Sequence, residues 1–215
     1  MRVLLLIISS PGESYDTFKE TWKCYMNLHE NIDSYFIELH PNIEEEMVVD
    51  HMNSTIIFRG EESTVPGCLL KTVLAIRKNV DKYNFIVRSN LSSLIHLDRL
   101  YKHIQNITHP LYYAGFLGNH HGIIFASGAL FIMSQEIAKC VSNHADITNI
   151  TLDDVYIGNL ISQKYGHMIV PLPRQESLFH KINVFDEGCF HYRFKTSDRT
   201  IDAFTHKKCA DLMYH

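Results

Sequence analysis

YNFIVRSNLSSLIHLDRL, residues 83–100, is the stretch from which the fold can be predicted. Its apolar run Phe85-Ile86-Val87 is typical of a buried strand, and a polar segment follows before a helix-period pattern resumes. In an open α/β sheet, ligands bind in the crevice beyond the carboxyl ends of the strands. The first candidates for a site are therefore Arg88, Asn90, Ser92 and Ser93. On this stretch alone, a polar strand-to-helix turn with a serine cap is an equal alternative.

The composition predicts an ordinary globular protein. The chain has 215 residues, of which 46% are hydrophobic and 20% are charged, so we expect a single domain over residues 1–215. The formal net charge is −4. Such a chain has no overall basic field to attract nucleic acid, and any anion must be bound by a local cluster of charges.

The N-terminus and the cysteines predict a cytoplasmic protein. The apolar run Val3 to Ile8 is too short for the core of a secretory signal, and we interpret it as a buried strand. No apolar stretch reaches the roughly 18 residues of a membrane span. Five cysteines without C-x-x-C spacing argue against both a disulfide framework and a zinc cluster.

Strand-like and helix-like segments alternate along the chain, which predicts an α/β fold with a mostly parallel sheet. The loop after the first strand lacks G-x-G-x-x-G, which argues against a dinucleotide site. Residues 40–53 are expected to form a solvated loop or a short helix. Strands are expected at 3–8, 34–39, 54–58, 83–87, 111–117, 168–172 and 190–195, and helices at 14–29, 66–79, 97–107, 134–143 and 151–163.

Two adjacent acids, Asp153 and Asp154, stand where the helix over 151–163 is expected to begin. The helix dipole keeps a carboxylate ionised at this position, and an ionised carboxylate facing a crevice can deprotonate a sugar hydroxyl. Thr151 with an acid three residues later also resembles a capping box. Both interpretations remain open, since one acid can cap the helix while the other acts as a base.

A cationic stripe is expected on the strand over 190–195. The period of two places His191, Arg193 and Lys195 on one face of that strand. Such a stripe suits a phosphate or a diphosphate. A polar strand face turned to water would have the same pattern.

A tight turn is expected at residues 118–122, where glycines flank His120 and His121. Paired histidines can ligate a metal, but neighbouring side chains in a turn point apart, and no cysteine or carboxylate accompanies them. We expect a loop that contacts substrate, with a purely structural turn as the alternative.

Taken together, these segments resemble the β1,3-glycosyltransferases and fringe-type enzymes. The resemblance spans about residues 54–166, is most specific at Asp153-Asp154-Val155-Tyr156-Ile157-Gly158, and extends to His191. In its compact form the chain is similar to the small glycosyltransferases of large algal viruses. The resemblance implies a GT-A fold, a Rossmann-like three-layer sandwich with a mostly parallel central sheet flanked by helices.

The resemblance also implies an activity, the inverting transfer of a sugar from a UDP-sugar to a glycan or glycoprotein acceptor. Asp154 would be the general base and Asp153 its neighbour. The implied donor-binding residues are Ile8, Ser9, Ser10, Arg59, Lys71, Arg88, Ser89, Asn90, Ser92, His191, Arg193 and Lys195, and the acceptor side would include Ser127, Gly128, His120 and His121.

The chain departs from the family at its metal motif. Asn90-Leu91-Ser92 stands where the family has an Asp-x-Asp that holds Mn²⁺. Neither Asn nor Ser supplies the negative charge that a hard divalent cation prefers. Dependence on Mn²⁺ or Mg²⁺ is therefore doubtful, with His191 as the candidate ligand, and the cationic stripe could neutralise the diphosphate instead.

Two alternatives to an enzyme remain open. The chain could be a nucleotide-sugar-binding module that lost catalysis together with its acidic metal motif. It could also be an α/β interaction domain that binds no nucleotide sugar.

Overall fold

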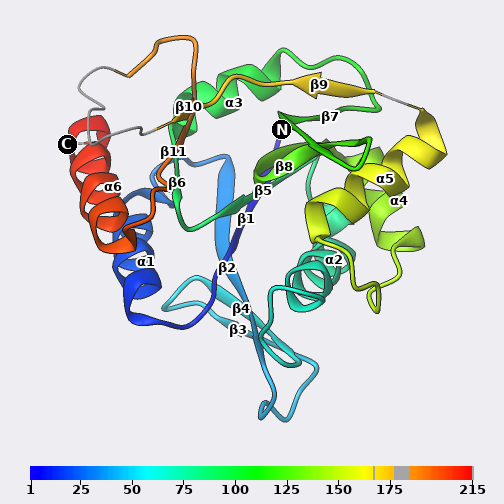
Figure 1. The fold of residues 1–215 in the computed structure, drawn as a ribbon, viewed down its shortest axis with the longest axis horizontal. Coiled ribbons are helices and arrows are strands. Elements are labelled where there is room, and N and C mark those ends of the chain that lie inside the picture. The colour runs from blue at the N-terminus through cyan, green and yellow to red at the C-terminus, as the bar shows by residue number, and fades with distance from the viewer. Residues whose placement is uncertain (167, 177–184, 215) are drawn as a thin grey trace.

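The computed structural model describes residues 1–166, 168–176 and 185–214, and it has helices on both faces of an eight-stranded sheet (Figure 1). Strands β3 and β8 run opposite to the other six, so the expected α/β fold with a mostly parallel central sheet is confirmed. In sheet order the strands are β3 (Met47–Asp50), β4 (Thr55–Arg59), β2 (Ile32–His40), β1 (Val3–Ile8), β5 (Phe85–Asn90), β8 (Ile123–Ser134), β7 (Tyr113–His120) and β9 (Ile169–Pro171).

Strand β1 lies at the centre of the sheet and is buried on both faces. Val3, Leu5 and Ile7 pack into one core cluster, and the alternate side chains pack into the other. A strand covered on both faces must be apolar at every position, which explains why its sequence is a continuous apolar run.

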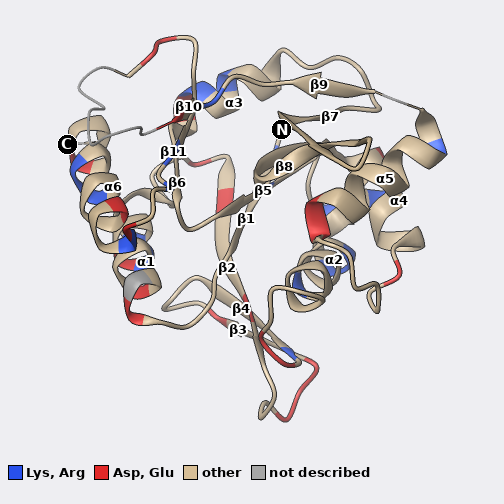
Figure 2. Cartoon of the chain, viewed as in Figure 1, with Lys and Arg blue, Asp and Glu red and all other residues tan. Residues whose placement is uncertain are grey.

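The helices form the two outer layers (Figure 1). One core cluster includes side chains from α1 (Glu13–Tyr25), α3 (Leu97–Gln105) and α6 (Arg199–Tyr214). The other includes side chains from α2 (Gly67–Asn79), α4 (Gln135–His144) and α5 (Asp153–Tyr165). A short 3-10 helix, η1 (Val80–Lys82), follows α2. Figure 2 shows the acidic start of α5 beside α2.

A small second sheet brings residues 191–193 close to the carboxyl end of β5. Its strands are β10 (Gln175–Glu176), β11 (His191–Arg193) and β6 (Ser93–Ile95), which follows β5 almost directly. Arg193 pairs with Ser93 and His191 pairs with Ile95. This pairing brings residues about a hundred positions apart in the sequence to the same sheet edge.

Several segments differ from the sequence-based expectations, and among them β6, β8 and β10 are strands that the sequence analysis does not predict. Residues 47–50, expected in a loop or short helix, form the edge strand β3, which pairs antiparallel with β4. The strand expected over 190–195 ends at Arg193. Helix α6 was not expected, because its buried face consists mainly of small and polar side chains and lacks an apolar period. Within the described part of the chain, no helix is both long and apolar enough to cross a membrane.

Candidate active site

A pocket of about 170 Å³ lies at the carboxyl ends of β1 and β5. Register pairing places Ile8, the last residue of β1, beside Asn90, the last residue of β5. Five of the expected donor-binding residues line this pocket, namely Ile8, Ser10, Asn90, Ser92 and Arg193. The other lining residues are Tyr15, Thr64, Cys68, Leu91 and Arg199.

Ser9 and Lys71 are buried and bonded to each other next to the end of β1. Lys71 is fully buried, forms an ion pair with Glu62, and donates a hydrogen bond of 2.6 Å to the Ser9 carbonyl oxygen. The Ser9 hydroxyl donates to Glu38 at 2.6 Å. Both expected residues therefore belong to the network that fixes the end of β1, and neither lines the pocket.

Asn90 is the centre of a hydrogen-bond network at the end of β5. Its Oδ1 accepts from Arg193 Nη1 at 2.6 Å, from the Ser93 hydroxyl at 3.2 Å and from the Ser92 hydroxyl at 3.3 Å. Because a guanidinium can only donate, the amide oxygen must be the atom that faces Arg193. The amide oxygen is thus already satisfied by protein donors. Ser89 donates to the Ala129 carbonyl oxygen at 3.0 Å and ties β5 to β8.

The expected cationic stripe on β11 is reduced to Arg193. His191 is buried, and its Nε2 lies 3.0 Å from the Ser93 hydroxyl. Burial, together with the charges of Arg174 and Arg193, holds the pKa of His191 well below its ordinary value, so its imidazole is neutral at physiological pH. Lys195 lies beyond the end of β11 and is exposed.

Two arginines that the sequence analysis did not single out join Arg193. Arg199, at the start of α6, lines the pocket. Arg174 forms an ion pair with Glu176 and stacks over the Phe116 ring, 3.8 Å from its centroid. No motif surrounds either residue in the sequence, and only the placement of β10, β11 and α6 brings them to this edge.

Arg88 and Asp153 form a buried ion pair. Arg88 also donates to the Gly128 carbonyl oxygen, so it links β5, β8 and the first residue of α5. Burial raises the pKa of Asp153, while the neighbouring Arg88 charge acts in the opposite direction. Both residues are thereby engaged in holding α5 against the sheet.

Asp154 lies beside this pair and remains half-buried. Its Oδ2 accepts a hydrogen bond of 2.7 Å from the Gly128 backbone N–H, and its Oδ1 accepts one of 2.9 Å from the Val155 N–H. Leu152 is the N-cap of α5 and makes no side-chain cap bond. The capping box with Thr151 is therefore not formed, and Asp154 is bound to β8 instead.

Of the other residues predicted for the site, one lies near the arginines beside the pocket and three do not. Ser127 is the near one, because Arg174 Nη1 lies 3.4 Å from its hydroxyl. His120 and His121 lie at the exposed β7–β8 turn with ring centroids 4.4 Å apart, and their ring nitrogens form no hydrogen bond with another described residue. Arg59 is exposed and donates to the Ile43 carbonyl oxygen at 3.1 Å, and it does not line the pocket.

The groups at the Asn90-Leu91-Ser92 position do not fit a divalent cation. The Asn90 oxygen faces a guanidinium, and the other candidate ligand, His191, is buried under the influence of the Arg174 and Arg193 charges. The described residues also contain no cluster of three or more His, Cys, Asp or Glu side chains that could hold a metal ion. A hard cation prefers anionic oxygen ligands, and here it would meet positive charge.

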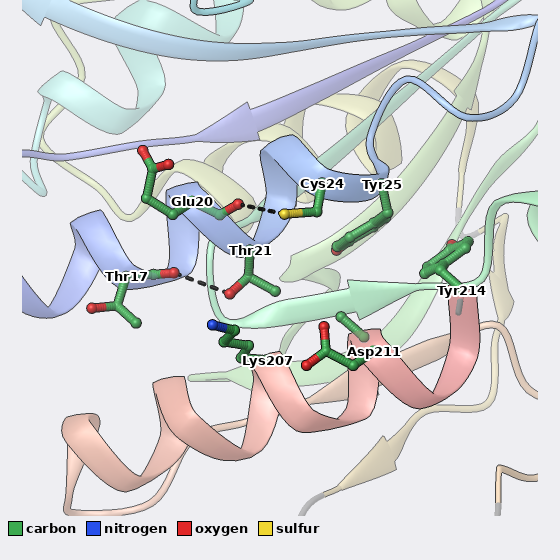
Figure 3. Close-up of a pocket in the computed structure, with 9 residues that line it drawn as sticks. Thr17, Glu20, Thr21, Cys24, Tyr25, Lys207, Asp211 and Tyr214 are labelled. Atoms are coloured by element: carbon green, nitrogen blue, oxygen red, sulfur yellow. Dashed lines mark hydrogen bonds between the residues drawn. The ribbon is translucent and has the colours of Figure 1, made fainter.

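A second pocket, of about 180 Å³, lies between α1 and α6 and shares no lining residue with the first (Figure 3). Tyr25 and Tyr214 stack at one end of it with ring centroids 4.7 Å apart. Arg88, Arg193, Asp153 and Asp154 all lie outside it. We therefore place the candidate active site at the sheet edge.

Solved structures with the same fold as this chain include two glycosyltransferases. One is a glycosyltransferase involved in the glycosylation of the major capsid of PBCV-1, with a TM-score of 0.52 and 10% identity over 99% of this chain and 100% of that one. The chain has a GT-A glycosyltransferase fold. The other structure is a mannosyltransferase from Pyrobaculum calidifontis in complex with GDP-mannose and Mn²⁺, with a TM-score of 0.51 and 12% identity over 80% of this chain and 55% of that one. No protein-family model and no curated protein sequence matches the chain.

Proposed function

We propose that the chain is an inverting glycosyltransferase that moves a sugar from a UDP-sugar to a hydroxyl of a glycan or glycoprotein, with residues 1–215 acting as one catalytic domain. The observation that carries the proposal is the pairing of a polar, arginine-lined pocket at the ends of β1 and β5 with a half-buried carboxylate, Asp154, fixed to the adjacent strand β8. The GT-A fold supports it. The order of motifs over residues 54–166 supports a relationship to the fringe-type enzymes.

Each part of the site has a role in this proposal. The pocket between Ser10 and Asn90 holds the nucleoside, and the arginine side of the pocket faces the diphosphate. Asp154 takes the proton of the acceptor hydroxyl as its oxygen attacks the anomeric carbon. The Arg88–Asp153 pair positions α5, and thereby Asp154, without contacting the reacting atoms. The five free cysteines are consistent with the cytoplasmic location we propose.

A second candidate function is a nucleotide-sugar-binding module without catalysis. The Asn90 side chain, which replaces an acidic residue and bonds to Arg193, is the observation that favours it. Binding without transfer or hydrolysis of the donor would support this candidate over the first.

A thermal-shift panel of UDP-, GDP- and CMP-sugars, each with and without Mn²⁺, tests the proposed donor directly. A ligand that binds only the folded state must raise the melting temperature. We expect UDP-sugars to give the largest shift. A panel in which no nucleotide sugar changes the melting temperature would contradict the proposal and favour an interaction domain.

A further inference from the structure

The charges of Arg88, Arg174 and Arg199 all act on Arg193. Among the described residues, Arg193 is the one member of this group that forms no ion pair. Arg88 pairs with Asp153, Arg174 with Glu176, and Arg199 with Asp202. Among the described residues, no carboxylate lies within 4.0 Å of Arg193. The sequence at 167, 177–184 and 215 contains no Asp or Glu that could serve as its partner.

Arg193 has donors to spare and faces the pocket. In the described part of the chain, the Asn90 oxygen is the sole hydrogen-bond partner of its guanidinium, at 2.6 Å from Nη1. Burial, with the charges of Arg174 and Arg199, lowers the pKa of Arg193 to about 10, so the group stays charged at neutral pH. Glu176 pairs with Arg193 in the β10–β11 register and partly offsets the repulsion, but its carboxylate is bonded to Arg174. A further anion beside Arg193 would therefore stabilise this half-buried cation.

We infer that Arg193, with Arg199 beside it in the pocket, binds the diphosphate of the nucleotide sugar in the place where a GT-A enzyme would hold a metal ion. This inference rests on the function proposed above. Guanidinium groups bind phosphate oxygens through paired N–H donors and need no metal bridge. The Asn90 amide points its oxygen toward Arg193, which leaves its Nδ2 to donate to the same anion.

Arg193, Arg199 and Asp154 together account for the charge that develops on the diphosphate and for the proton that leaves the acceptor. As the acceptor oxygen bonds to the anomeric carbon, the bond from that carbon to the diphosphate oxygen breaks and the diphosphate keeps the electron pair. Arg193 and Arg199 compensate the added negative charge, and the acceptor proton moves to Asp154. Nucleotide binding is then independent of divalent metal.

Calorimetric titration of UDP and of GDP into the chelator-treated chain tests the inference, with EDTA in one series and Mn²⁺ in the other. We expect the wild-type chain to bind nucleotide in EDTA. Arg193→Gln, which keeps a donor for Asn90 but removes the charge, should weaken binding about ten- to hundredfold. Arg193→Lys should lie between the two, and Lys78→Ala, which removes one exposed charge on α2, should bind like the wild type.

Melting temperatures measured on the same samples show whether each variant is folded. If Arg193→Gln is unfolded, the affinity of Arg193→Lys is compared with that of the wild type instead. Binding that requires Mn²⁺, or equal affinities of the wild type and both Arg193 variants, would overturn the inference and leave the proposed function standing. The absence of UDP and GDP binding in both series would overturn the proposed function and the inference with it.

Discussion

The carboxylate of Asp154 and the backbone N–H of Gly128 are joined by a hydrogen bond of 2.7 Å, while the carbonyl oxygen of the same glycine accepts from Arg88. Gly128 therefore connects the candidate base to the buried Arg88–Asp153 pair. The two adjacent acids of α5 are thereby separated in role, since Asp153 neutralises a buried cation and Asp154 keeps an exposed side. The predictions below follow from this division.

Asp153→Asn should destabilise the fold. Arg88 would keep its charge in a buried site without its partner, and breaking a buried ion pair on one side reduces the free energy of unfolding by about 3–5 kcal/mol. Urea unfolding of the variant measures this loss. The neighbouring Asp154→Asn is the matched control and should stay within about 1 kcal/mol of the wild type. Equal effects of the two substitutions would contradict the division of roles.

Gly128→Ala should damage the site through a steric clash. A Cβ at this position would lie 2.5 Å from Arg88 Nη1 and 3.1 Å from Asp154 Oδ2, so the ion-pair network must move. We expect a loss of about 1–3 kcal/mol in the free energy of unfolding, with a marked loss of transfer. Gly188→Ala, whose Cβ would approach no closer than 3.4 Å to Asp186, should be nearly neutral. A Gly128→Ala chain with wild-type stability and transfer would refute the proposed linkage.

Cys68 offers a direct test of where the nucleotide binds. Its thiol lines the pocket, and burial raises its pKa, so alkylation should be slow but measurable. Saturating nucleotide should slow the modification of Cys68 several-fold further. Cys24, which is exposed on α1 outside this pocket, should be modified at the same rate with and without nucleotide. Peptide mass spectrometry after timed iodoacetamide treatment distinguishes the two thiols, and unprotected Cys68 would place the nucleotide elsewhere.

His206 should make the stability of the fold pH-dependent. It is fully buried, donates to the Ser93 carbonyl oxygen at 3.1 Å, and burial lowers its pKa from 6.5 to about 4. Because the unfolded chain binds the proton more tightly, the contribution of His206 is complete above pH 6.5 and is lost as the pH falls toward 4. The full loss is on the order of 3 kcal/mol.

Urea unfolding at several pH values checks this prediction when the wild type is compared with His206→Phe. The substitution keeps an aromatic ring against Phe18 and Phe194 and removes the titrating group. The variant should show a shallower decrease in stability between pH 6.5 and 4. Parallel curves for the two chains would show that His206 does not titrate in this range.

The sequence predicts β1 and β5 well, because both strands are buried along almost their whole length. It does not predict β8, whose apolar run is interrupted at Ser127 and Gly128. The continuous apolar run of β1 and the polar residues after Val87 predict that Ser10, Asn90 and Ser92 lie at the carboxyl ends of the strands, and in the structure they line a pocket there with Arg193.

Helix α6 could not be predicted, because its sequence has no apolar pattern that marks a buried face. Its buried face is built from side chains such as Ala203, Thr205 and His206, while Phe204 is 69% exposed, so its hydrophobic pattern does not reveal the face that packs.

The sequence also could not predict that Asp153 pairs with Arg88 while Asp154 bonds to Gly128. These contacts depend on Arg88 and Gly128, which lie 65 and 26 positions away in the chain respectively. The lowered pKa of His191 has the same kind of origin, since it results first from burial and then from the charges of Arg174 and Arg193. Such contacts depend on tertiary placement, and no local pattern encodes them.

Asp154→Asn, measured with the nucleotide sugar that gives the largest thermal shift, tests the central claim most directly. Release of nucleoside diphosphate by the purified chain, through transfer or hydrolysis, should fall at least about a hundredfold, because the variant cannot accept the acceptor proton. The donor affinity from calorimetry and the melting temperature should stay near wild type, since Asn keeps an oxygen for the Gly128 N–H. Nucleotide release at the wild-type rate by a folded Asp154→Asn chain would contradict the role of Asp154 as the base.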